Sequence, residues 1–166
     1  MIFGDPNLFS VWFDPVELWS TNSIKNGCLS YVIGGKFIST AKSTIGADIT
    51  QMSALECLRR DIGDGGIFDL PVREAYKVLC DRAFPSVDSG ANCSERTYLV
   101  SVGSLLDDGH NIFLLNSESK SKLICGCDGG SGESVFELIL DNGVVESVIR
   151  GSIDGWGAFM RMIKNI

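Results

Sequence analysis

The sequence has 166 residues, which is enough for one globular domain with a sizeable hydrophobic core. Hydrophobic residues make up 45% and charged residues 21% of the chain, close to a globular average, which excludes a disordered protein. The formal net charge is −7, and residues 88–154 hold the whole acidic excess. An acidic surface repels phosphate, so we expect neither nucleic acid nor anionic membrane as a partner, whereas a basic protein would be attracted. The alternative is that the negative charge only keeps a small protein soluble.

The N-terminal segment and the cysteines indicate in which cellular compartment the protein acts. Residues 1–6 show neither a basic region nor the apolar core of a signal peptide, and no run approaches the ~20 apolar residues of a membrane span. We therefore expect a cytoplasmic protein, in which thiols stay reduced. The six cysteines are Cys28, Cys57, Cys80, Cys93, Cys125 and Cys127.

The first third of the chain predicts short antiparallel strands. Residues 9–14 form a β-rich run that places Phe9, Val11 and Phe13 on one face and Trp12 on the other. An Asn-Gly pair at 26–27 predicts a tight turn. Residues 28–33 and 36–39 then read as two strands, which the Gly-Gly pair between them joins into a hairpin.

Two helices are predicted in the middle of the chain. Residues 40–52 are ambiguous between strand and helix, and residues 53–60 suit a short helix with Ser53 and Glu56 as a capping box. Residues 71–84 give the clearest helical pattern, with Asp69 near the N-terminal cap. The apolar stripe of this helix follows the i, i+3, i+4, i+7 spacing: Val72, Ala75, Tyr76, Leu79, Cys80 and Ala83.

The second half predicts a meander of strands. The expected strands are residues 97–102, 111–115 and 122–127, with a turn at 107–109. Residues 135–141 and 144–150 flank an Asn-Gly pair, the strongest short-range signal for a type I′ hairpin. A helix at 153–163 is expected to follow. The predicted fold is a single α+β domain over 1–166, an antiparallel meander sheet with a few packed helices.

The sequence contains no convincing catalytic or metal-binding set. Cys125 and Cys127 would share one face of a strand, and Cys93 and His110 are the nearest other soft donors, but no CxxC zinc motif is present. A Cys–His nucleophile pair is formally possible, yet no cysteine-protease signature accompanies it. We therefore predict no cofactor and no metal, and interpret the cysteines as buried and reduced.

Acidic loop residues displayed on a rigid sheet are the remaining candidate site, because such surfaces bind basic proteins. The candidate partner-binding residues are Asp107, Asp108, Glu118, Asp128 and Glu133.

Several short motifs resemble the immunity proteins that bacteria encode beside polymorphic toxins, including toxins of contact-dependent growth inhibition; the sequence is similar to immunity protein family 42. The motifs are residues 1–6, Phe9, Phe13-Asp14, Trp19, Asn26-Gly27, Gly34-Gly35, residues 68–71 and Phe84-Pro85.

The resemblance implies a binding protein and not an enzyme. Its expected partner is the C-terminal domain of a cognate toxin in the cytoplasm, and many such toxins are nucleases with basic substrate-binding surfaces. An acidic inhibitor could occupy such a surface. Two other classes stay open from the residues alone: a small thiol- or metal-dependent enzyme, and a generic interaction adaptor.

Overall fold

The computed structural model describes residues 1–58, 65–86, 88, 94–127 and 134–163. The chain falls into two compact units. The first comprises the described residues of Met1–Ala54, Val102–Asp108 and Gly143–Ile166, and the second those of Leu55–Ser101 and Gly109–Asn142. Each unit contains one antiparallel sheet with packed helices, which confirms the α+β class but divides the strands between two sheets. That all of 1–166 forms a single domain stays a prediction.

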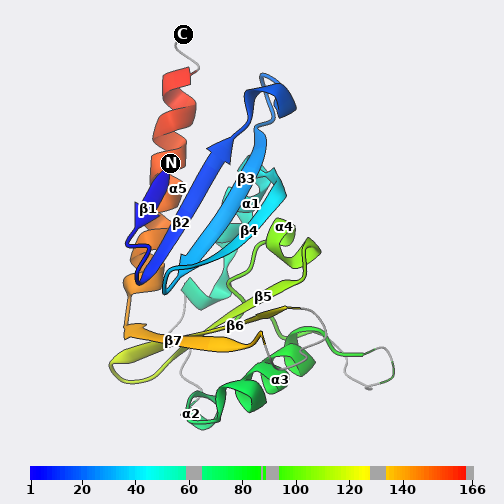
Figure 1. The fold of residues 1–166 in the computed structure, drawn as a ribbon, viewed down its shortest axis with the longest axis vertical. Helices are drawn as coiled ribbons and strands as arrows, with labels where there is room; N and C mark the ends of the chain where they lie inside the picture. The colour runs from blue at the N-terminus through cyan, green and yellow to red at the C-terminus, as the bar shows by residue number, and fades with distance from the viewer. Residues whose placement is uncertain (59–64, 87, 89–93, 128–133, 164–166) are drawn as a thin grey trace. The chain divides into compact units, whose positions relative to one another are not determined.

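The first unit is built on a four-stranded antiparallel sheet in which sequential strands are neighbours (Figure 1). Its strands are β1 (Ile2–Gly4), β2 (Phe9–Pro15), β3 (Asn26–Ile33) and β4 (Lys36–Thr44). Phe9, Val11 and Phe13 are fully buried, whereas Trp12 is partly exposed, so the predicted period of two is confirmed. The predicted hairpin at 34–35 is also confirmed, with β3 and β4 paired from Ile33 and Lys36 outward.

Two helices pack on the first sheet, α1 (Ile45–Ala54) and α5 (Val144–Ile163). Figure 1 shows both on the same face, where α5 contacts β1 and β2 while α1 contacts β3. The Trp156 ring on α5 meets the Phe13 ring on β2 with centroids 6.0 Å apart. The buried residues of β2 therefore form one core with the apolar stripe of α5.

The predicted turn at 26–27 is wrong. Asn26 and Gly27 begin β3, and Gly27 lies against the backbone of Asp14 and Pro15 on β2. The chain reverses earlier, through the 3-10 turn η1 (Glu17–Trp19) and a Thr21 N–H to Ile24 C=O contact. The glycine here provides a close approach between strands, which the local sequence signal does not distinguish from a turn.

The predicted helix at 53–60 is also wrong. Helix α1 precedes it, and Ser53 near its C-terminal end donates its hydroxyl to the Thr50 carbonyl, so Ser53 caps no helix start. A 3-10 turn, η2 (Glu56–Leu58), follows, and residues 59 and 60 of the predicted helix lie outside the part of the chain that the structure describes. A serine three residues before a glutamate fits a capping box only where a helix begins, and here one ends.

The second unit contains the sheet β5 (His110–Asn116), β6 (Lys120–Cys127) and β7 (Phe136–Asp141), joined in that order. Helices α2 (Gly65–Phe68) and α3 (Val72–Ala83) pack on it, and the Tyr76 and Phe113 rings meet edge to face at 6.0 Å. The predicted helix at 71–84 and the strands at 111–115 and 122–127 are confirmed. Pro71 occupies the N-terminal cap of α3 and makes no side-chain cap hydrogen bond.

The predicted strand at 97–102 is wrong. Leu99 makes one isolated bridge to Phe113, and the chain then enters the short helix α4 (Gly103–Asp107). The predicted turn follows α4 at Asp108 and Gly109.

The predicted hairpin around the Asn-Gly pair at 142–143 is wrong in its second strand, since residues 144–150 begin α5. A type I′ turn needs positive φ at both central residues. Gly143 has a φ of 83°, but no non-glycine residue in the described part of the chain has positive φ. The Asn142 side chain instead donates to the Ser117 carbonyl and accepts from the Ser121 hydroxyl, which ends β7 against the β5–β6 turn.

Candidate partner-binding surfaces

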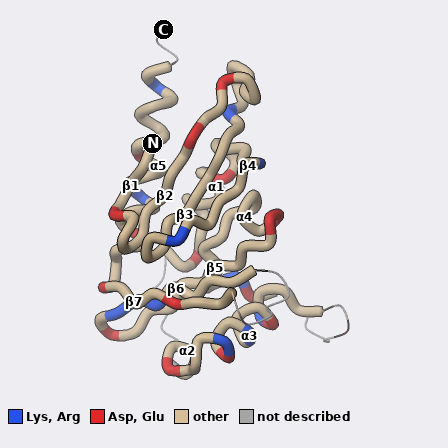
Figure 2. Tube along the Cα trace, viewed as in Figure 1, with Lys and Arg blue, Asp and Glu red and all other residues tan. Residues whose placement is uncertain are grey.

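The acidic pair Asp107 and Asp108 lies at the C-terminal end of α4 in the first unit, where Figure 2 shows acidic residues on the trace. Asp107 is exposed. Asp108 Oδ1 accepts a hydrogen bond from Lys42 Nζ on β4 at 2.6 Å. This hydrogen bond and the negative charge of Asp108 raise the pKa of the Lys42 ammonium. Asp107 is therefore the more available carboxylate of the two for a partner.

A buried carboxylate holds the acidic pair in place. Asp48 on α1 is buried and accepts hydrogen bonds from the hydroxyls of Ser43 and Ser104, at 2.5 and 2.7 Å. Asp48 Oδ1 also accepts from the Ser104 backbone N–H at 3.3 Å. One turn along α1, Gln51 Oε1 accepts from the Gly103 N–H at 2.6 Å. These contacts attach the start of α4, and so the acidic pair at its end, to α1.

The remaining predicted acidic residues are distributed differently. Glu118 is exposed in the turn between β5 and β6 of the second unit. Asp128 and Glu133 lie outside the described residues. The structure thus brings Asp107 and Asp108 together in one segment, while Glu118 belongs to the other unit.

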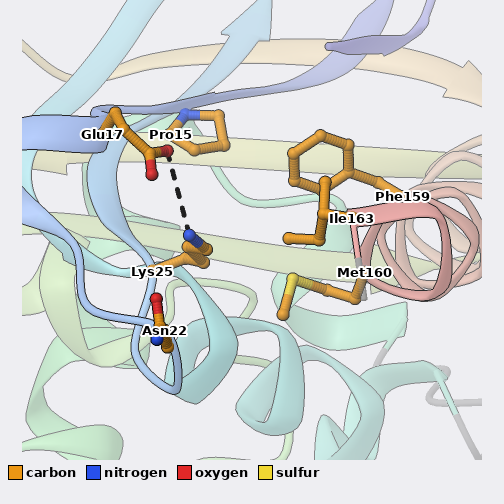
Figure 3. Close-up of a pocket in the computed structure, with 7 residues that line it drawn as sticks. All are labelled: Pro15, Glu17, Asn22, Lys25, Phe159, Met160 and Ile163. Atoms are coloured by element: carbon orange, nitrogen blue, oxygen red, sulfur yellow. Dashed lines mark ion pairs between the residues drawn. The ribbon is translucent and has the colours of Figure 1, made fainter. Parts of the chain in front are cut away.

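A pocket in the first unit was missed by the sequence analysis. It has a volume of about 470 Å³ and lies between the η1 segment and the end of α5 (Figure 3). Its lining residues are Pro15, Glu17, Asn22, Lys25, Phe159, Met160 and Ile163. The signal in the sequence is that residues 16–25 contain several large apolar side chains between two predicted strands, where no predicted helix or strand would bury them.

Two of the predicted soft donors, Cys127 and His110, lie close together. Cys127 is exposed, and its Sγ lies 3.3 Å from His110 Nδ1 across the β5–β6 pairing, whereas Cys125 is buried. Cys93 lies outside the described residues. Within the part of the chain that the structure describes, no three His, Cys, Asp or Glu side chains gather as metal ligands.

The comparisons with known proteins give the class. The sequence model of the family Imm42, Immunity protein 42, matches residues 1–154. The chain belongs to this family of immunity proteins, which confirms the predicted resemblance.

A solved structure is similar over nearly the whole chain. The crystal structure of CdiI from Burkholderia dolosa AUO158 has 42% sequence identity and a TM-score of 0.90, and the match covers 93% of this chain and 99% of that one. A search of curated proteins found no match. In the described residues, no helix is long and apolar enough to cross a membrane.

Proposed function

We propose that this protein neutralises the C-terminal domain of a cognate toxin by binding it in the cytoplasm. Membership of the Immunity protein 42 family carries this proposal, and the similarity to CdiI supports it. The protein acts as a non-enzymatic inhibitor and needs no cofactor. The toxin is a basic nuclease, because a net charge of −7 favours a partner whose surface evolved to bind phosphate.

The partner-binding residues that we propose are the acidic set Asp107, Asp108, Glu118, Asp128 and Glu133. Exposed carboxylates attract a basic surface from a distance and exclude the anionic substrate once the complex has formed. Asp107 is exposed at the end of α4, and Asp48 holds the start of α4 through buried hydrogen bonds. Because this backbone is already fixed before binding, the segment that carries Asp107 loses little conformational freedom when the partner binds.

Co-expression tests the proposal directly. The toxin C-terminal domain encoded beside this gene would be expressed with and without this protein, and the pair would then be co-purified. Cell survival together with a stable complex is the expected result. Cell death despite good expression of this protein, with no complex recovered, would contradict the proposed function.

Charge reversal of Asp107 and Glu118 to lysine should slow association with the toxin several-fold, because each change reduces electrostatic steering. The reduction should be larger at low salt, where charges are less screened. Association rates at two ionic strengths, measured by biolayer interferometry, would check this. Reversal of Glu74, an exposed acid on α3, is the control. Equal association rates for all variants would remove these residues from the site.

A further inference from the structure

The pocket of the first unit has one apolar wall and one mixed wall. Phe159, Met160 and Ile163 extend from the last turns of α5 toward the chain between β2 and β3 (Figure 3). Pro15 at the end of β2 faces them, and the Glu17–Lys25 ion pair lies beside it. Apolar groups on both sides of an open pocket favour an apolar occupant.

Large apolar side chains are exposed on the elements that form this pocket, close in sequence to its lining residues. Leu18 is 95% exposed, and Trp19, Ile24 and Met162 are each at least half exposed. Each lies one or two residues from a lining residue in sequence. We call these four residues the rim. Exposed apolar residues on the elements that form a pocket are typical of a protein interaction site, and tryptophan is enriched among residues that dominate binding energy.

The charges at the pocket define the chemistry of the partner. The Glu17 side chain is 91% exposed, whereas the Lys25 side chain is only 11% exposed, and their charged groups lie 3.8 Å apart. The acid of this pair therefore faces outward while its base is covered. Arg161, the basic residue in the last turn of α5, extends back toward Gly157 and does not line the pocket. The outward face is apolar with a carboxylate at its edge.

We infer that the pocket and its rim form a docking surface for the cognate toxin domain, which inserts an apolar side chain while an adjacent lysine or arginine pairs with Glu17. This inference rests on the proposed function and extends it to a pocket that Asp107, Asp108 and Glu118 do not line. An exposed carboxylate beside an apolar pocket complements a basic partner. The cation of the partner would pair with the carboxylate, and the apolar side chain next to that cation would be buried away from water in the pocket.

Affinity measurements on the full chain test this surface. The binding partner is the toxin C-terminal domain encoded beside this gene, carrying an inactivating substitution. The double variant Leu18→Ser/Ile24→Ser should weaken binding by about tenfold or more, because exposed apolar anchors are removed without opening the core. Glu17→Lys should weaken binding as well. Phe37→Ser is the matched control, since Phe37 on β4 is a comparably exposed apolar residue of the same unit, and its affinity should stay within about twofold of wild type.

The outcomes separate this inference from the proposed function. If the wild-type chain forms no complex, the proposed function fails, and the inference fails with it. If wild type binds and the rim variants bind equally well, only the inference is overturned. Sedimentation velocity of the isolated chain identifies another occupant: rim variants that abolish self-association but keep toxin affinity would assign the surface to a second copy and overturn the inference. Thermal unfolding of each variant confirms that the fold is retained.

Discussion

Gly27→Ala is expected to destabilise the protein by about 3 kcal/mol, because the added methyl group has no space between two paired strands. A Cβ at this position would lie 2.1 Å from the Asp14 carbonyl oxygen and 2.9 Å from the Pro15 Cα. Both are backbone atoms, which cannot move aside as a flexible side chain could. The β2–β3 pairing must separate locally, and urea unfolding monitored by circular dichroism would measure the loss.

The control for this change is Gly151→Ala on α5. Gly151 is exposed and helical, and nothing lies within 4 Å of an added Cβ. Alanine should therefore stabilise the helix by roughly 0.5–1 kcal/mol. If the two variants had similar urea midpoints, the close approach of Gly27 to β2 would be refuted. The experiment also tests the strand start at Asn26, because a glycine in an open turn at 26–27 would tolerate alanine better.

Asp48→Ala is expected to cost about 3 kcal/mol, since it removes the acceptor of three hydrogen bonds inside the first unit. The hydroxyls of Ser43 and Ser104, both buried, would lose this partner. The start of α4 would lose its attachment to α1, so hydrogen exchange of the Ser104 amide should also accelerate. Urea unfolding and amide exchange by NMR would measure the two effects.

A milder variant calibrates this second prediction. Gln51→Ala removes an exposed acceptor of the Gly103 N–H, and it should cost only about 1 kcal/mol because water can replace the lost partner. If Asp48→Ala cost no more than Gln51→Ala, the buried carboxylate would not be what holds α4. Because Asp107 and Asp108 follow on the same helix, Asp48→Ala should also slow toxin association in the assay proposed for the acidic residues.

The elements that the sequence predicted correctly are those whose side-chain spacing allows one interpretation. Residues 11–14 alternate buried and less buried side chains, and the stripe of α3 repeats at helical spacing with proline at both ends. The glycine pair at 34–35 and the strands β5 and β6 were equally clear. Of the family motifs, Phe9, Phe13-Asp14 and Gly34-Gly35 lie within these elements, and residues 68–71 and Phe84-Pro85 flank α3.

The error around Asn142 and Gly143 shows where local signals fail. An Asn-Gly pair predicts that the chain turns, but the residues that follow decide between strand and helix. The residues of α5 that are buried, Val145, Ile149, Ser152 and Trp156, follow one another at intervals of four, three and four residues, which is helical spacing. Burial against β1 and β2 favours the helix over the β-rich composition of 144–150, a tertiary effect that outweighs local propensity.

The sequence by itself determined the α+β class, the family and the acidic excess, since these depend on composition, periodicity and short motifs. Only the tertiary structure decided which side chains share a surface. Lys42 and Asp108 form an ion pair across 66 positions, and the pocket joins residues near 15–25 to the end of α5. Such pairings depend on how helices pack on a sheet, which no local pattern encodes. For the same reason the exposed rim around Leu18 became visible only after its neighbours had been placed.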